Sequence, residues 1–197
     1  TMLIADENTA IFITNRRDLA GLPDSMVSAF AAAAAERGRP GEWAVVNTRS
    51  SVDPFLTFSQ NRALRERVWT AFKNRGDNGD ANDTNAVIAD ILRLRAERAQ
   101  ILGFPTHAHL RMADTMAGTP ERAQELMMRV WPAAVARVRE EVRDQQALAT
   151  RLGHNITIEP WDYRFYMEKV RQERYNLDQA QVKPYFELSN LINGMFW

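Results

Sequence analysis

The hydrophobic pattern changes near residue 59, from short apolar runs to apolar positions at helical spacing. Before that point, three runs are rich in β-branched and aromatic residues. Such runs predict strands, and we expect the three to form a small antiparallel or mixed sheet near the N-terminal end. They cover residues 10–14, 43–47 and 55–58.

A helix is predicted between the first two of these runs. Pro23 suits the first turn of a helix, where its missing N–H leaves no bond unmade, and Gly38 provides an end signal. The alanine run at 31–35 favours helix and allows a neighbouring element to approach closely.

After residue 59, capping residues and glycines divide the chain into helices. We expect Ser59 to cap a helix that ends near Gly76, and Asp83 or Thr84 to cap a longer one that ends at Gly103. The composition of residues 76–83 is typical of a turn, so these residues predict a loop.

Two further helices are predicted from threonine caps. Thr106 should begin a short helix, and Thr119 followed by Pro120 should begin one that reaches Leu152, about 50 Å long at the α-helical rise. Pro132 predicts either a kink in this helix or a junction where two helices abut.

The region from residue 160 to 186 concentrates aromatic and charged residues. Pro160 is expected to open a helix whose aromatic side chains point to more than one side and must therefore be covered on more than one side. Arg171, Arg174 and Asp178 would then need partners from other elements.

These patterns predict a mainly α fold with no compositional break. Residues 10–58 would form a helix and the small sheet, and residues 59–197 a helical region, both within one segment 1–197. The side chains expected to be largely buried are Trp69, Ile91, Leu92, Trp131, Trp161, Phe165 and Leu188.

Composition limits the partners of the chain. Lys plus Arg and Asp plus Glu are 25 each, so no net charge attracts nucleic acid or anionic lipid. The absence of cysteine excludes disulfides and thiolate metal sites. No apolar run approaches the roughly 20 residues of a membrane span. We expect a cytoplasmic location and leave a periplasmic one open.

Both ends of the sequence are apolar. The last residues are Met195, Phe196 and Trp197, and residues 2–4 are also apolar. Because chain ends are usually polar, we interpret the sequence as a segment of a longer protein, and we expect these residues to be exposed and to promote self-association.

No pattern in the chain predicts a catalytic, cofactor-binding or metal-binding residue. His107 and His109 are two apart, and on a helix they point about 200° from each other, so they cannot close on one ion. His154 stands alone after a glycine. Asp77, Asp80 and Asp83 lack the distal glutamate of a calcium loop.

A set of short motifs, in this order, resembles the thimet-oligopeptidase family of zinc peptidases and within it the bacterial peptidyl-dipeptidase branch. The resemblance covers residues 19–197. The motifs are Leu19-Ala20-Gly21-Leu22-Pro23, Asn82-Asp83-Thr84, Leu102-Gly103-Phe104-Pro105, Ala113-Asp114-Thr115-Met116-Ala117, Thr119-Pro120-Glu121, Pro160-Trp161-Asp162, Leu177-Asp178 and Lys183-Pro184-Tyr185-Phe186-Glu187-Leu188.

The resemblance implies a segment of a two-lobed, mostly helical enzyme whose deep channel admits oligopeptides and excludes folded proteins. It implies zinc as the cofactor of the parent enzyme, held by a His-Glu-x-x-His motif. That motif is absent from this sequence, so no zinc is expected in this chain.

Two hypotheses about function follow. In the first, the chain is a fragment, inert alone, of a zinc-dependent dipeptidyl carboxypeptidase that releases C-terminal dipeptides from oligopeptides. In the second, it is a free-standing helical binding or scaffold module. A related oligo-endopeptidase remains an alternative within the first hypothesis.

Overall fold

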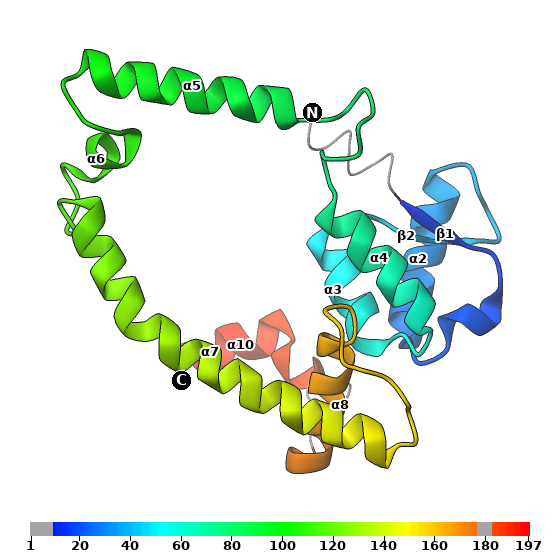
Figure 1. Cartoon of the computed structure of the whole chain (residues 1–197). Coiled ribbons are helices and arrows are strands. Elements are labelled where there is room, and N and C mark those ends of the chain that lie inside the picture. The colour runs from blue at the N-terminus through cyan, green and yellow to red at the C-terminus, as the bar shows by residue number, and fades with distance from the viewer. Residues whose placement is uncertain (1–9, 177–182) are drawn as a thin grey trace.

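The structure is a computed structural model that describes residues 10–176 and 183–197. It is mainly helical, with one small sheet near the N-terminal end, as the sequence predicted. Figure 1 shows a body that contains the sheet and α2–α4, an arc formed by α5, α6 and α7, and a return to the body at α8. Among the described residues, no helix combines the length and apolar character needed to cross a membrane.

The sheet consists of two antiparallel strands, β1 (Ile11–Ile13) and β2 (Trp43–Val45). Ile11 pairs with Val45 and Ile13 with Trp43. The short 3-10 helix η1 (Arg16–Leu19) follows β1, and α2 (Asp24–Glu36) packs against β2. Both strands and α2 lie where the sequence predicted them.

The third predicted strand is wrong. Residues 55–58 belong to the helix α3 (Arg49–Phe58), which buries Val52, Phe55 and Leu56. These positions have helical spacing, i, i+3 and i+4. Pro54 lies inside the helix. It removes one internal hydrogen bond, and burial of the apolar face against β2 and α4 compensates for that loss.

The helix α4 (Arg62–Lys73) begins later than expected. Asn61 caps it by accepting a hydrogen bond from the Leu64 N–H, at 3.1 Å from Oδ1 to N. Ser59, the predicted cap, is instead the fully buried C-cap of α3. Asparagine satisfies the free N–H groups of a first turn as well as serine does, so the sequence pattern did not separate the two.

One hydrophobic core joins the sheet to α2, α3 and α4. Its centre contains Phe30, Phe55 and Val68, all almost fully buried. The remaining members are Ile13, Leu19, Leu22, Val45, Val52, Leu56 and Leu64.

The arc contains α5 (Asn85–Ile101), α6 (His107–Met112) and α7 (Pro120–Arg151). Thr84, Thr106 and Thr119 are their N-caps, as predicted. Pro132 lies inside α7, and the helix continues through it, so the alternative of two abutting helices is wrong.

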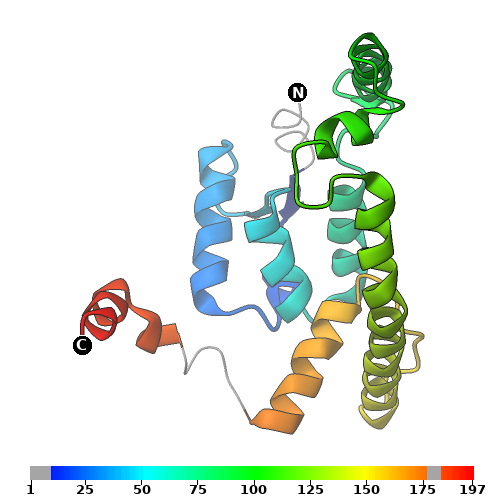
Figure 2. The same ribbon diagram turned by 90° about the vertical axis from the view of Figure 1, so that its left-hand side faces the viewer.

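After α7 the chain turns through residues 152–162 into α8 (Tyr163–Tyr175), which packs against α7 and α3. The prediction that Pro160 opens this helix is wrong, because Asp162 is its N-cap. The 3-10 helix η2 (Lys183–Phe186) and α10 (Leu188–Met195) follow, and Figure 2 shows α10 set apart from the body.

The burial prediction is confirmed for Phe165 and wrong for four other residues. Ile91 and Leu92 on α5, Trp131 on α7 and Leu188 at the start of α10 are exposed, with Trp131 at 63% and Leu188 at 70%. Trp69 and Trp161 are half-buried.

The partners expected for the charged residues of α8 lie partly on α8 itself. Arg171 pairs with Glu168 one turn before it, at 2.7 Å, and Arg174 reaches Asp144 on α7 at 2.6 Å. Asp178 and residues 2–4 lie outside the described residues.

Candidate functional site

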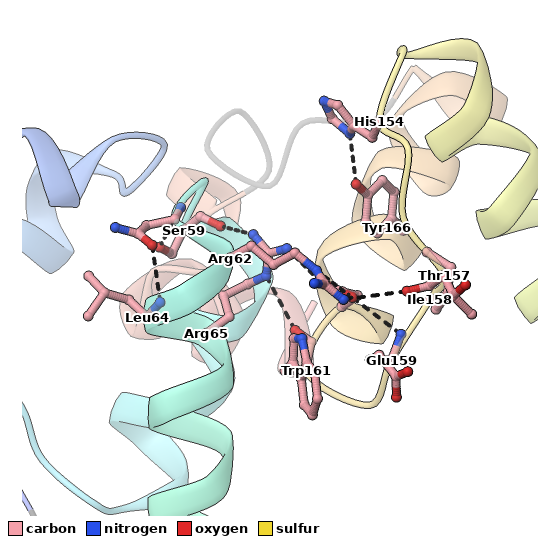
Figure 3. Close-up of polar contacts among 12 residues, drawn as sticks. Ser59, Arg62, Leu64, Arg65, His154, Thr157, Ile158, Glu159, Trp161 and Tyr166 are labelled. Atoms are coloured by element: carbon pink, nitrogen blue, oxygen red, sulfur yellow. Dashed lines mark hydrogen bonds and ion pairs between the residues drawn. The ribbon is translucent and has the colours of Figure 1, made fainter.

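The candidate site is built around the carboxylate of Asp162. It is fully buried and lies at the first turn of α8. Arg65 Nη2 lies 2.7 Å from its Oδ1, and Arg62 Nη2 lies 2.8 Å from its Oδ2. Figure 3 shows both guanidinium groups, from α4, meeting the loop that precedes α8.

Helical spacing brings the two arginines to the same carboxylate. Arg62 and Arg65 are three residues apart in the first turns of α4, so they lie on one face of that helix. Asp162 Oδ2 also accepts a hydrogen bond from the Glu159 N–H at 3.2 Å, which fixes the turn before α8. The carboxylate therefore joins two segments about 100 residues apart in the chain.

The other donors of the two arginines bind main-chain oxygens. Arg65 donates from Nη1 to the Ser59 carbonyl at 2.8 Å and from Nε to the Trp161 carbonyl at 3.3 Å. Arg62 donates from Nη2 to the Thr157 carbonyl at 3.4 Å. Arg65 is almost fully buried, and all three of its nitrogens have acceptors, which offsets the cost of removing its charge from water.

The hydrogen bond to Asp162 raises the pKa of the Arg62 guanidinium above its ordinary value. Burial opposes this rise, and the charges of Asp162, Glu66 and Glu159 add to it. The Arg62 guanidinium therefore stays charged at every physiological pH.

Aromatic side chains surround the ion pairs. Trp161 meets Trp69 of α4 edge to face, with ring centroids 5.7 Å apart. The guanidinium of Arg65 lies 4.3 Å from the centroid of the Phe165 ring. Such contacts add to the stability of a desolvated cation, so the cluster is a rigid junction between α4 and α8.

A cavity of about 580 Å³ lies beside this junction. It is bordered by α4, by the loop after α7 and by α8. Its lining residues are Gln60, Arg62, Arg65, Leu152, His154, Ile156, Phe165, Tyr166 and Lys169.

The three histidines occupy separate places. His154 contributes to the cavity and hydrogen-bonds the Tyr166 hydroxyl through Nδ1 at 2.7 Å. His109 Nδ1 lies 2.8 Å from the hydroxyl of its own helix cap, Thr106, and its Nε2 lies 3.4 Å from Glu121. Desolvation lowers the pKa of His107, and the positive charge of neighbouring arginines lowers it further.

The residues present do not fit a zinc ion. In the described part of the chain, no three His, Asp or Glu side chains gather closely enough to hold a metal. The three aspartates at residues 77–83 hold the loop together instead, and Asp83 accepts hydrogen bonds from the Gly79 and Asn85 N–H groups.

A second cavity, of about 460 Å³, lies at the start of α7. Its lining is mostly apolar and includes the exposed Trp131. The other lining residues are Met112, Pro120, Ala123, Gln124, Met127 and Met128.

The family model of peptidase family M3 matches residues 55–197, which include the whole junction at Asp162. The chain belongs to peptidase family M3. The resemblance to this group of peptidases, predicted from the motifs, is thereby confirmed.

Two similar proteins are dipeptidyl carboxypeptidases. The chain is 37% identical over 197 residues to that of Escherichia coli K12, covering all of this chain and 29% of that protein. The corresponding Salmonella typhimurium enzyme is 35% identical with the same coverage. Organellar oligopeptidase A of Arabidopsis thaliana is 34% identical over 196 residues, covering 93% of this chain and 24% of that protein. The chain thus spans under a third of these relatives.

The sequence did not predict Arg62 and Arg65 as partners of Asp162. Pro160-Trp161-Asp162 was recognised as a motif, but nothing local connects it to α4. The sequence feature that could have indicated these partners is the pair of arginines at helical spacing directly after a helix cap, followed by a tryptophan.

Proposed function

We propose that this chain is a non-catalytic segment, residues 1–197, of a larger zinc-dependent dipeptidyl carboxypeptidase. The parent would bind oligopeptides and release C-terminal dipeptides. The supporting observation is the match over the full chain, 37% and 35%, to two dipeptidyl carboxypeptidases. The oligopeptidase A relatives match at 31–34% over 93% of the chain.

The role proposed for the segment is structural. Its ion-pair junction sets the angle between α4 and α8, and the described residues supply no metal ligand set. In a longer peptidase such a rigid helical frame would support the walls of the substrate channel, while residues outside this segment would hold the zinc.

The test of the exopeptidase assignment uses a full-length protein containing this segment. Two quenched fluorescent peptides of one sequence would be compared, one with a free C-terminal carboxylate and one amidated. A dipeptidyl carboxypeptidase cleaves only the free peptide and removes two residues. Equal cleavage of both would establish an oligo-endopeptidase instead.

The test of the fragment assignment uses the 197-residue chain alone. After dialysis we expect no stoichiometric zinc by elemental analysis and no cleavage of either peptide, with or without added zinc. One tightly held zinc per chain, or chelator-sensitive turnover in a rigorously purified sample, would contradict the proposal. If the chain is inert and a longer protein containing it is inert too, the peptidase assignment is contradicted and the non-catalytic binding or scaffold module is the remaining interpretation.

A further inference from the structure

The cavity beside the Asp162 junction has an unbalanced charge. Arg62, Arg65 and Lys169 line it, and its lining includes no carboxylate among the described residues. Asp162 lies behind the two arginines and balances only one of them. Glu66 and Glu159 act on Arg62 from outside the cavity lining.

Several hydrogen-bond donors in this lining remain available. Lys169 lies 4.8 Å from the Phe165 ring centroid and, within the described chain, pairs with no carboxylate. Arg62 uses Nε and Nη2 for Asp162 and Thr157, which leaves Nη1 without a described acceptor. His154 hydrogen-bonds the Tyr166 hydroxyl through Nδ1, and in the tautomer in which Nδ1 accepts from that hydroxyl, Nε2 carries the N–H and is free to donate.

Much of the remaining lining is apolar. Leu152 and Ile156 come from the end of α7 and the loop after it, and Phe165 and the ring of Tyr166 come from α8. Figure 3 shows the Tyr166 hydroxyl pointing toward His154. A ligand here would meet donors on one part of its surface and apolar side chains on another.

We propose that this cavity binds a small organic carboxylate that carries one apolar group, of the size of an amino acid with a blocked amine. The carboxylate would lie between Arg62 Nη1, Lys169 Nζ and His154, where charge-assisted hydrogen bonds form. The apolar group would contact Leu152, Ile156 and Phe165. The volume, about 580 Å³, lies within the range of small-molecule sites. The inference does not depend on the proposed function.

The test is titration calorimetry on the 197-residue chain with N-acetylphenylalanine. N-acetylphenylalaninamide lacks the carboxylate and tests whether the carboxylate is needed. Acetate lacks the aromatic group and tests whether the apolar contact is needed, and inorganic phosphate tests whether another class of anion binds. We expect N-acetylphenylalanine to bind at least about tenfold more tightly than the other three compounds. Equal affinity for the amide, binding of phosphate as tight as that of the acid, or no binding at millimolar concentration would each overturn the proposal.

A pair of lysine variants locates the site. Lys169→Met removes the unpaired ammonium but retains an unbranched apolar side chain, and should weaken binding of the acid about tenfold. Lys73→Met is the matched control, since Lys73 lies 4.9 Å from the centroid of the Trp69 ring and outside the cavity lining. Circular dichroism would establish that both variants fold. Equal weakening by both variants, or by neither, would also overturn the assignment.

Discussion

Arg65 and Asp162 form an ion pair of 2.7 Å in which both side chains are at most 2% exposed. Their positions in the chain are 97 residues apart. Because neither group can return to water without separating α4 from α8, the pair couples two parts of the molecule.

Asp162→Asn should destabilise the chain by about 3–5 kcal/mol, because it leaves Arg65 charged, buried and without its partner. Urea denaturation followed by circular dichroism would measure this loss. Asp90→Asn is the control, since Asp90 forms an exposed pair with Arg93 and should change stability by less than about 1 kcal/mol. A similar small effect at both positions would mean that the buried pair contributes little.

Gly21→Ala should be more harmful than Gly103→Ala, although both glycines have positive φ, +88° and +76°. An alanine Cβ at position 21 would lie 2.4 Å from the Phe58 carbonyl oxygen, whereas nothing lies within 4 Å at position 103. We expect the substitution at position 103 to lower the free energy of unfolding by about 1–2 kcal/mol, because alanine disfavours the positive φ. At position 21 the loss should be at least about 1 kcal/mol larger, because of the added steric clash. Thermal or urea unfolding of the two variants would check this order, and equal losses would contradict it.

Stability should fall as the pH rises above about 10. Burial raises the pKa of Tyr166 above its ordinary value of 10.0, and burial together with the hydrogen bond to Glu141 raises that of Tyr163. The unfolded chain therefore loses these protons first, so the stabilising contribution is complete below pH 10 and is lost at higher pH. Urea titrations at pH 8 and 10.5 would measure the slope.

Phenylalanine variants identify the tyrosines responsible for that slope. Tyr163→Phe and Tyr166→Phe should each make it shallower. Tyr175→Phe, at a tyrosine that is 71% exposed, should leave the slope unchanged. A slope that is the same in all three variants would assign it to other groups.

The chain should self-associate through its exposed apolar helix surfaces. Met127 and Trp131 belong to the lining of the second cavity and are 61% and 63% exposed. Sedimentation velocity at increasing concentration should show dimers or larger species, and the double variant Met127→Gln, Trp131→Gln should reduce them. Met167→Gln, on α8, is the control. A monomer at every concentration would contradict this prediction.

The sequence predicted the helical elements well where local chemistry decides them. Thr106 and Thr119 are caps whose side chains accept hydrogen bonds from N–H groups in the first turns of their own helices, and the structure places each at a helix start. Residues 55–58 failed because a short apolar run fits a strand or a buried helix face equally well. Only the packing of α3 against β2 and α4 distinguishes the two.

Burial and the candidate site were harder to predict. Apolar residues at helical spacing on α5 and α7 indicate an apolar helix face, but the spacing does not say which element covers that face. Leu92 and Trp131 were therefore predicted to be buried, whereas both are exposed. Likewise, Asp162 contacts Arg62 and Arg65 only because the fold brings α8 back to α4. No local sequence pattern predicts a contact between residues so far apart in the chain.

The chain returns to α4 after the arc, so the parts before and after the arc are joined by direct contacts as well as by the backbone. The parts before and after the arc are held by Arg62 and Arg65 on Asp162, by Arg164 on Asp53 at 3.1 Å, and by the packing of α3 against α8. None of these contacts passes through α5 or α6. A single cut of the peptide backbone in the turn between those two helices would therefore leave two halves that remain bound as a nicked complex.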